Sequence, residues 1–215
     1  MKEKIDFRLS FFDYWRYRKR IRRLLDKHDR VPIVRVERWR IKECVYYGLI
    51  DAERIDPDSW ERIRRLPRAR DSPAWAGAAE LVGGEVEECV LFATEEDAWQ
   101  NSLYDVCYAG TFLRLSEVKS VLESPHKLPV HLEEEMNDVG ETHMGGMVVN
   151  FILKDGSKFY HTSGSANLSF VSTPEGCSPD DIVDVEYGRG SSFVPAKPSL
   201  KGPRYKWCVF NPPIK

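Results

Sequence analysis

The sequence predicts an α+β fold, in which a helical, basic N-terminal part is followed by a mostly antiparallel sheet with short helices. Three observations predict it: an amphipathic stretch over residues 10–28, an Asp-Gly pair at 155–156 between two apolar runs, and further short apolar runs towards the C-terminus. The 215 residues are 42% hydrophobic, which is enough to bury a core and too much for an intrinsically disordered chain.

The N-terminal part begins with a predicted helix over residues 10–28, capped by Ser10 with Asp13 three positions later. One face of this helix is aromatic and aliphatic, and another carries arginine and lysine. Residues 33–39 alternate between apolar and polar and predict a strand, whereas residues 40–50 fit either a helix or a second strand.

A second helix is predicted to begin after Asp56, which can cap it, with Pro57 at the first helical position, and to run to Leu66. The proline- and glycine-bearing segment 67–84 follows and favours a boundary. We therefore expect two parts, a basic helical and strand module over residues 1–70 and an acidic α+β domain over residues 71–215.

The middle of the chain mixes short elements. Residues 89–93 predict a buried strand, and Thr94 is a suitable cap for a helix that starts after it. Residues 104–113 predict a strand and 116–122 a short helix, while the acidic, poorly periodic segment 129–146 is expected to be a loop.

The C-terminal part contains the strongest hairpin signal, Asp155-Gly156 between the two apolar runs of segment 147–162. Further strands are predicted at residues 182–187 and 205–210, with a loop at 195–203.

The net charge of −2 is a cancellation of two opposite halves. Residues 1–70 carry 21 Lys and Arg against 12 Asp and Glu, and residues 71–215 carry 11 against 22. Within the second half, residues 71–145 hold 3 basic and 16 acidic groups. Such an asymmetry indicates nucleic acid, a charged protein partner, or docking between the two halves.

The basic half supplies one candidate binding surface. Arginine and lysine neutralise phosphates, and the same surface also suits an acidic protein. The candidate residues for binding a polyanion or a partner are Arg16, Lys19, Arg20, Arg23, Arg38 and Arg40. The aromatic residues of the same helix fall on its apolar stripe, which leaves the arginines without stacking platforms for bases.

The acidic half supplies the other candidate surface, a partner-binding face formed by Glu133, Glu134, Glu135 and Asp138. A weaker alternative is a divalent-metal site at His131, Glu133 and His143, in a metal-dependent enzyme that uses the 131–143 cluster.

The five cysteines show no Cys-x-x-Cys pair, which argues against structural zinc. Cys44, Cys89, Cys107 and Cys208 have apolar neighbours and are expected in the core, and Cys177 in an exposed loop. We expect no cofactor.

Residues Asp155-Gly156 followed by Gly164-Ser165-Ala166-Asn167 resemble the second half of the phospholipase D superfamily motif, His-x-Lys-x(4)-Asp followed by Gly-Ser-x-Asn. In that family the histidine is the nucleophile and the lysine binds phosphate. The matching positions here are Val148 and Asn150, so the resemblance, which covers about twenty residues, implies an inactive relative.

No nucleophile elbow, phosphate-binding loop or dinucleotide fingerprint is present, and the sequence therefore favours a non-catalytic protein over an enzyme. We expect a binding or accessory protein that uses charged surfaces on a protein partner, as inhibitors and immunity proteins do. The alternative is a nucleic-acid-binding component of a larger assembly. The sequence shows neither a signal peptide nor an apolar run long enough for a bilayer, so we expect a cytoplasmic protein without membrane contact.

Overall fold

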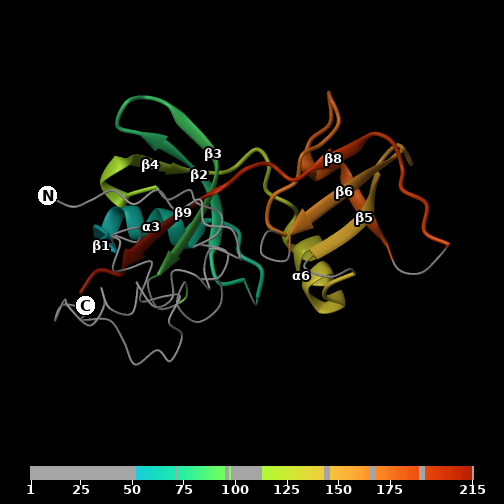
Figure 1. The fold of residues 1–215 in the computed structure, drawn as a ribbon. Coiled ribbons are helices and arrows are strands. Elements are labelled where there is room, and N and C mark those ends of the chain that lie inside the picture. The colour runs from blue at the N-terminus through green and yellow to red at the C-terminus, as the bar shows by residue number, and fades with distance from the viewer. Residues whose placement is uncertain are drawn as a thin grey trace, which may run out of the picture.

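The described residues of the computed structural model form two separate sheets, each with one α-helix. The structure describes residues 52–70, 72–94, 97, 113–142, 146–164, 168–188 and 192–214. Figure 1 shows two lobes side by side, which the chain connects once between β4 and α6 and once between β8 and β9. Each sheet has its own hydrophobic cluster.

The first sheet has five strands in the order β1-β9-β3-β2-β4. β9 is parallel to both of its neighbours, while β2 is antiparallel to β3 and β4. The bounds are Glu53–Arg54 for β1, Trp75–Leu81 for β2, Val86–Thr94 for β3, Val118–Leu122 for β4 and Lys206–Asn211 for β9.

Helix α3, Pro57–Arg65, packs on this sheet and confirms the helix predicted after Asp56. The Asp56 carboxylate accepts a hydrogen bond from the Ser59 backbone N–H at 2.9 Å, which satisfies one of the first-turn donors. Ile63 of α3 shares a buried cluster with Phe92 of β3 and Phe210 of β9. Residues far apart in the sequence therefore form one core.

The second sheet has four strands in the order β7-β5-β6-β8, and helix α6, Val130–Val139, packs against it. Leu132 and Met136 of α6 lie in one buried cluster with Val149, Phe151 and Phe159. The bounds are Gly146–Leu153 for β5, Lys158–Gly164 for β6, Ile182–Tyr187 for β7 and Ser199–Lys201 for β8.

The β5–β6 pair confirms the hairpin that the Asp-Gly pair predicts. Gly156 has a φ of 82°, which is a left-handed conformation that glycine adopts without strain. The Asp155 carboxylate accepts a hydrogen bond from the Ser157 backbone N–H at 2.9 Å and fixes the turn.

The expected fold class is wrong in two respects. The described part of the chain is mostly sheet, with two α-helices, and it gives no support to a helical basic N-terminal part. Its strands form two sheets instead of one, with three parallel pairs, β1–β9, β3–β9 and β6–β8. Parallel pairing joins distant segments, and no local turn signal announces it.

Three of the expected local elements also differ. Residues 116–122 form a 3₁₀ turn, Leu115–Glu117, followed by β4, because Val118 and Val121 pair along β2 instead of facing a helix partner. The expected loop 129–146 contains α6. The expected loop 195–203 contains β8.

Several other expectations are confirmed. Strands occur at the predicted positions β3, β7 and β9, and Thr94 Oγ1 accepts a hydrogen bond from the Asp97 backbone N–H at 3.0 Å, as a cap would. The elements expected at residues 10–28, 33–39 and 40–50 lie outside the described residues, as do residues 104–112 of the strand expected at 104–113. The division at residue 70 stays a prediction. No helix of the described segments is long and apolar enough to cross a membrane.

Candidate functional site

The acidic residues predicted as a partner-binding face all lie on α6, and the first of them is buried. Glu133 is only 2% exposed. Its carboxylate pairs with the Lys127 ammonium and accepts a hydrogen bond from Ser169 Oγ at 2.7 Å. Glu133 therefore fixes the segment before α6 to the segment after β6, and its charge does not reach solvent.

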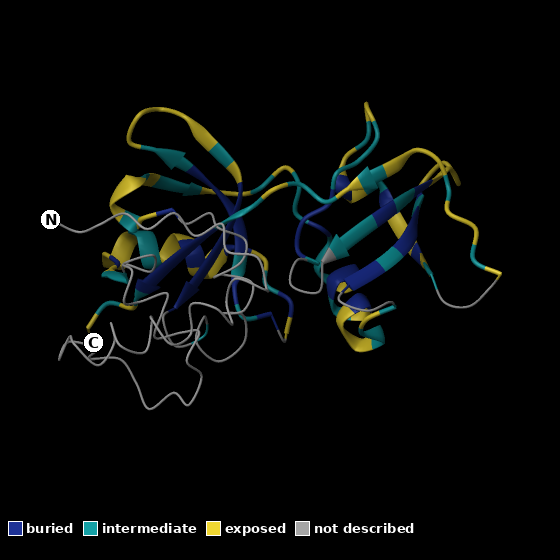
Figure 2. Cartoon of the chain, in the orientation of Figure 1, coloured by how far each residue is buried: buried dark blue, intermediate teal, exposed yellow. Residues whose placement is uncertain are grey.

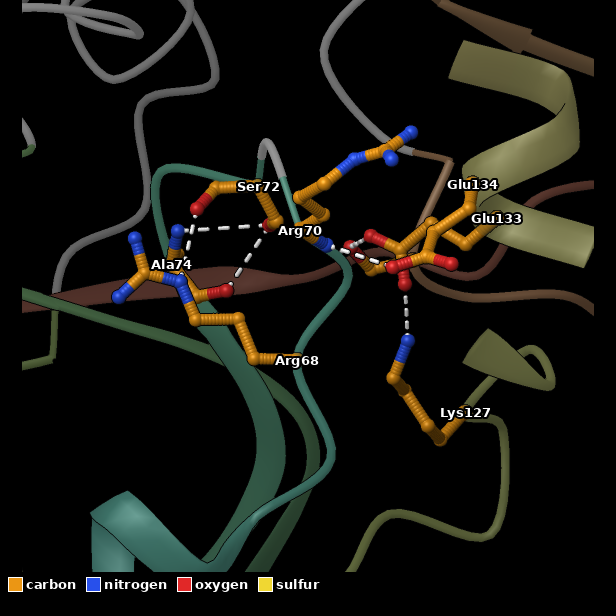
Figure 3. A network of polar contacts seen from close by, with 8 residues as sticks. Arg68, Arg70, Ser72, Ala74, Lys127, Glu133 and Glu134 are labelled. Carbon is orange, nitrogen blue, oxygen red and sulfur yellow. Dashed lines mark hydrogen bonds and ion pairs between the residues drawn. The ribbon is translucent and has the colours of Figure 1, made fainter. Parts of the chain in front are cut away.

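Glu134 and Asp138 are one helical turn apart on α6, and both contact Arg70, which lies between α3 and β2. Figure 3 shows the contact of Arg70 with Glu134. The Arg70 backbone N–H donates to Glu134 Oε1 at 2.9 Å, and the Arg70 guanidinium lies 3.6 Å from Asp138 Oδ1. These contacts join the lobe of the first sheet to the helix of the second.

Glu135 accepts a hydrogen bond from the Tyr187 hydroxyl at 2.8 Å. All four residues of the predicted acidic face thus have partners inside the fold. The sequence alone could not show that the contacts of these carboxylates are internal.

The basic candidates, Arg16, Lys19, Arg20, Arg23, Arg38 and Arg40, lie outside the described residues.

The alternative metal site is not assembled in the described part of the chain. His131 is exposed on α6, Glu133 is buried and paired with Lys127, and His143 lies outside the described residues. No group of three or more His, Cys, Asp or Glu side chains in metal-binding arrangement occurs where the structure describes the chain.

One position of the phospholipase D-like motif serves the fold of the second sheet, while residues 165–167 of the motif lie outside the described residues. Asn150, at the lysine position, is buried and donates to Glu186 Oε2 and to the Val194 carbonyl, both at 2.9 Å. Its side-chain carbonyl accepts a hydrogen bond from the Ala196 backbone N–H at 2.9 Å. The bonds to Val194 and Ala196 hold the segment after β7 against the sheet, and no phosphate-binding lysine occupies this position.

Cys89 and Cys208 lie in the core as expected, and burial raises the pKa of each thiol to about 12. A thiol with so high a pKa is protonated at neutral pH and is not a nucleophile. Cys177 is half-buried, where an exposed position was expected.

Sequence reasoning missed a surface on the β2–β3 hairpin, where the described residues from 82 to 86 are all exposed (Figure 2). Val82 and Val86 are 69% and 52% exposed, and Glu85 lies between them in the chain. Exposed Glu88 follows on β3. We call Val82, Glu85, Val86 and Glu88 the hairpin surface. The Gly83-Gly84 turn signal between two valines could have revealed it.

The geometry of this turn presents the hairpin surface to solvent. Leu81 N–H donates to the Glu85 carbonyl at 2.7 Å, and Gly84 N–H donates to the Leu81 carbonyl at 2.9 Å. Gly84 has a φ of 86°, which favours glycine. The Val82 backbone N–H donates to the Glu117 carbonyl at 2.9 Å, so the turn is fixed to the segment before β4.

Comparison with known proteins gives no relative: no family model, curated protein or solved structure matches this chain. The resemblance to the phospholipase D superfamily therefore stays confined to one short motif. Any functional argument depends on the residues described above.

Proposed function

We propose that this protein is a non-catalytic accessory protein that binds a basic protein partner, as proteins of the inhibitor or immunity type do. The observation that carries the proposal is the hairpin surface, which combines two solvent-exposed valines with exposed glutamates. Protein interfaces combine an apolar centre with a polar rim in this way.

The charge of the surrounding segment favours a basic partner. Residues 71–145 carry 16 acidic against 3 basic groups, and the hairpin lies within them. Opposite charge on the partner would accelerate association and would make binding sensitive to salt. The valines would supply the apolar contact that salt does not weaken.

The hairpin also suits this role better than α6. The four acidic residues of the expected face on α6 bond to Lys127, Ser169, Arg70 and Tyr187, so their carboxylates are engaged within the fold. On the hairpin surface, Glu85 lies in the chain between the exposed Val82 and Val86, whereas Glu88 is exposed but also contacts His126 Nε2 at 3.1 Å.

The proposed setting is the cytoplasm. Cys89, Cys177 and Cys208 are free thiols in the structure, which is the usual state in a reducing compartment.

Affinity capture with the full chain tests the proposal. The wild type and a double charge reversal on the hairpin, Glu85→Lys with Glu88→Lys, are immobilised and exposed to nuclease-treated extract of the native host. A matched control reverses two exposed acids of the second lobe, Glu175→Lys with Asp180→Lys.

We expect the wild type and the control to retain the same protein from the extract. The hairpin variant should retain at least about tenfold less of that protein than the wild type, and rising salt should elute it. Equal retention by all three proteins would contradict the proposal. A parallel capture from untreated extract is the comparison: retention there that is absent from the nuclease-treated extract would favour the nucleic-acid alternative instead.

A further inference from the structure

A histidine lies in the apolar core of the second lobe. His161 of β6 is 2% exposed, and its ring lies 5.3 Å from the ring of Phe151, centroid to centroid. Its Nδ1 atom is buried and has no hydrogen-bond partner. A buried polar atom without a partner is uncommon in folded proteins and calls for an explanation.

The short strand β8 covers one side of this histidine. In the β6–β8 pair, His161 stands opposite Leu200. Gly202, directly after β8, is so close that a Cβ built there would lie 3.5 Å from the imidazole Cε1. The imidazole ring is therefore enclosed between the core and the backbone that follows β8.

β8 is also the weakest side of this enclosure. It has three residues and forms the edge of the sheet. The Tyr160 N–H donates to the Pro198 carbonyl at 2.9 Å, and the Gly202 N–H donates to the Thr162 carbonyl at a long 3.4 Å. The opposite side is β5, which pairs with β6 over seven residues from Gly146 to Ile152.

The surroundings of His161 offer no anion to a charged imidazole. On β5, the residues on the same face are Met147, Val149 and Phe151, none of which titrates. On β8, Lys201 is exposed and has the same sign of charge. The α6 carboxylate nearest the core, Glu133, is engaged by Lys127 and Ser169. Burial alone lowers the pKa of His161 to about 4.

We propose that His161 is an acid-sensitive switch that releases β8 from the second sheet when its imidazole takes up a proton. An imidazolium has two N–H donors and a charge that must be hydrated. The displacement of β8 exposes the ring to water and breaks few hydrogen bonds, whereas displacement of β5 or α6 would open the hydrophobic core. Release also uncovers the edge of β6, to which another strand can pair.

The direction of the effect follows from linkage. The pKa of His161 is lowered with β8 in place, so the released state binds more protons and gains population as pH falls below the ordinary value of about 6.5. With an ordinary pKa in the released state, the ratio of released to closed protein rises about 50-fold between pH 7 and pH 4.5.

Hydrogen exchange on the full chain, expressed as protection relative to the intrinsic rate at each pH, tests the switch. In the wild type, protection of the Tyr160 and Gly202 amides should fall on the order of 50-fold between pH 7 and pH 4.5. The amides that pair β5 with β7 should keep their protection. In His161→Phe, the protection of the Tyr160 and Gly202 amides should not fall with pH. In the control His131→Phe, at an exposed position on α6, it should fall as in the wild type.

Two results would overturn the proposal. One is a fall in amide protection in the His161→Phe variant equal to that in the wild type, and the other is simultaneous loss of protection in β8 and in the β5–β7 pair. If His161→Phe does not fold, NMR titration of His161 in the wild type decides. A ring that titrates at its ordinary pKa while β8 stays protected contradicts the switch, and titration coincident with the loss of β8 protection supports it.

Discussion

At the scale of single residues, the buried pair of Glu133 and Lys127 is the most consequential polar contact of α6. Both side chains are nearly inaccessible, and Ser169 completes the cluster from the segment after β6. Separate removal of either partner leaves a buried charge without compensation. We infer that these residues hold the second lobe together rather than bind a partner.

Glu133→Ala is predicted to lower the free energy of unfolding by about 3 kcal/mol, because the Lys127 ammonium stays buried without its partner. Urea denaturation followed by circular dichroism measures the change. The control is Glu135→Ala, at an exposed position on the same helix, where we expect less than about 1 kcal/mol. Similar losses in both variants would contradict the structural role of Glu133.

Asn150 affects a neighbouring carboxylate in a way that can be measured. The pKa of Glu186 is lowered, first by the hydrogen bond from the Asn150 amide and second by that from Lys158. Asn150→Ala removes the larger cause, so the pKa of Glu186 should rise towards its ordinary value. NMR titration of the Glu186 side-chain carboxyl checks this, and Lys158→Ala, which removes a hydrogen bond and a neighbouring charge, should also raise the pKa of Glu186. An unchanged pKa in Asn150→Ala would contradict the assigned bond.

At the scale of secondary structure, β2 depends on a glycine where α3 and β4 approach it. A Cβ at Gly77 would lie 2.6 Å from Leu66 Cδ1 and 2.8 Å from the Leu122 carbonyl oxygen. Both contacts are far below van der Waals distance, and the second involves backbone that cannot rotate away.

Gly77→Ala is therefore predicted to destabilise the protein by about 2 kcal/mol through overpacking. Gly83→Ala is the matched control on the same hairpin, because nothing lies within 4 Å of its Cβ position. Thermal unfolding of the two variants beside the wild type should show a clearly lower melting temperature for Gly77→Ala alone. Equal melting temperatures would refute the close approach.

The edge strands of both sheets carry features that discourage pairing with other chains. The β2–β4 register shifts between Glu80 and Leu81, and the β5–β7 register shifts between Ile152 and Leu153. β4 also has the exposed Lys119. Irregular register and exposed charge are the usual protection of an edge. A partner of the closed protein is therefore expected to contact side chains rather than to add a strand.

The same elements show which parts of the fold can be predicted from the sequence. Local signals sufficed for α3, whose cap and first-turn proline are adjacent in the chain, and for the β5–β6 hairpin, whose Asp-Gly turn is a local feature. They failed for α6, because the charged residue Glu133 occupies a position on its buried face and interrupts the apolar periodicity. They predicted β9 as a strand but not its parallel neighbours, because that pairing depends on contacts with segments more than 100 residues away in the chain.

At the scale of the whole molecule, some charged residues of the two halves contact each other, and others are exposed to solvent. Two arginines of the basic half contact carboxylates of the acidic half in the described structure: Arg70 meets Glu134 and Asp138, and the Arg68 guanidinium lies 4.0 Å from Asp97 Oδ2. The carboxylates of the hairpin surface are exposed, although that of Glu88 also contacts His126. The sequence narrows the candidate site to an acidic segment, but the choice of the β2–β3 hairpin within it required knowledge that Val82 and Val86 are exposed.

Hydrogen exchange footprinting of the full chain, alone and with the partner fraction that the wild type retains, tests this assignment most directly. We expect slower exchange for the amides of residues 82–88 in the presence of the partner, and unchanged exchange rates for the amides of α6. Slower exchange confined to α6, or an unchanged hairpin while the partner is bound, would contradict the assignment.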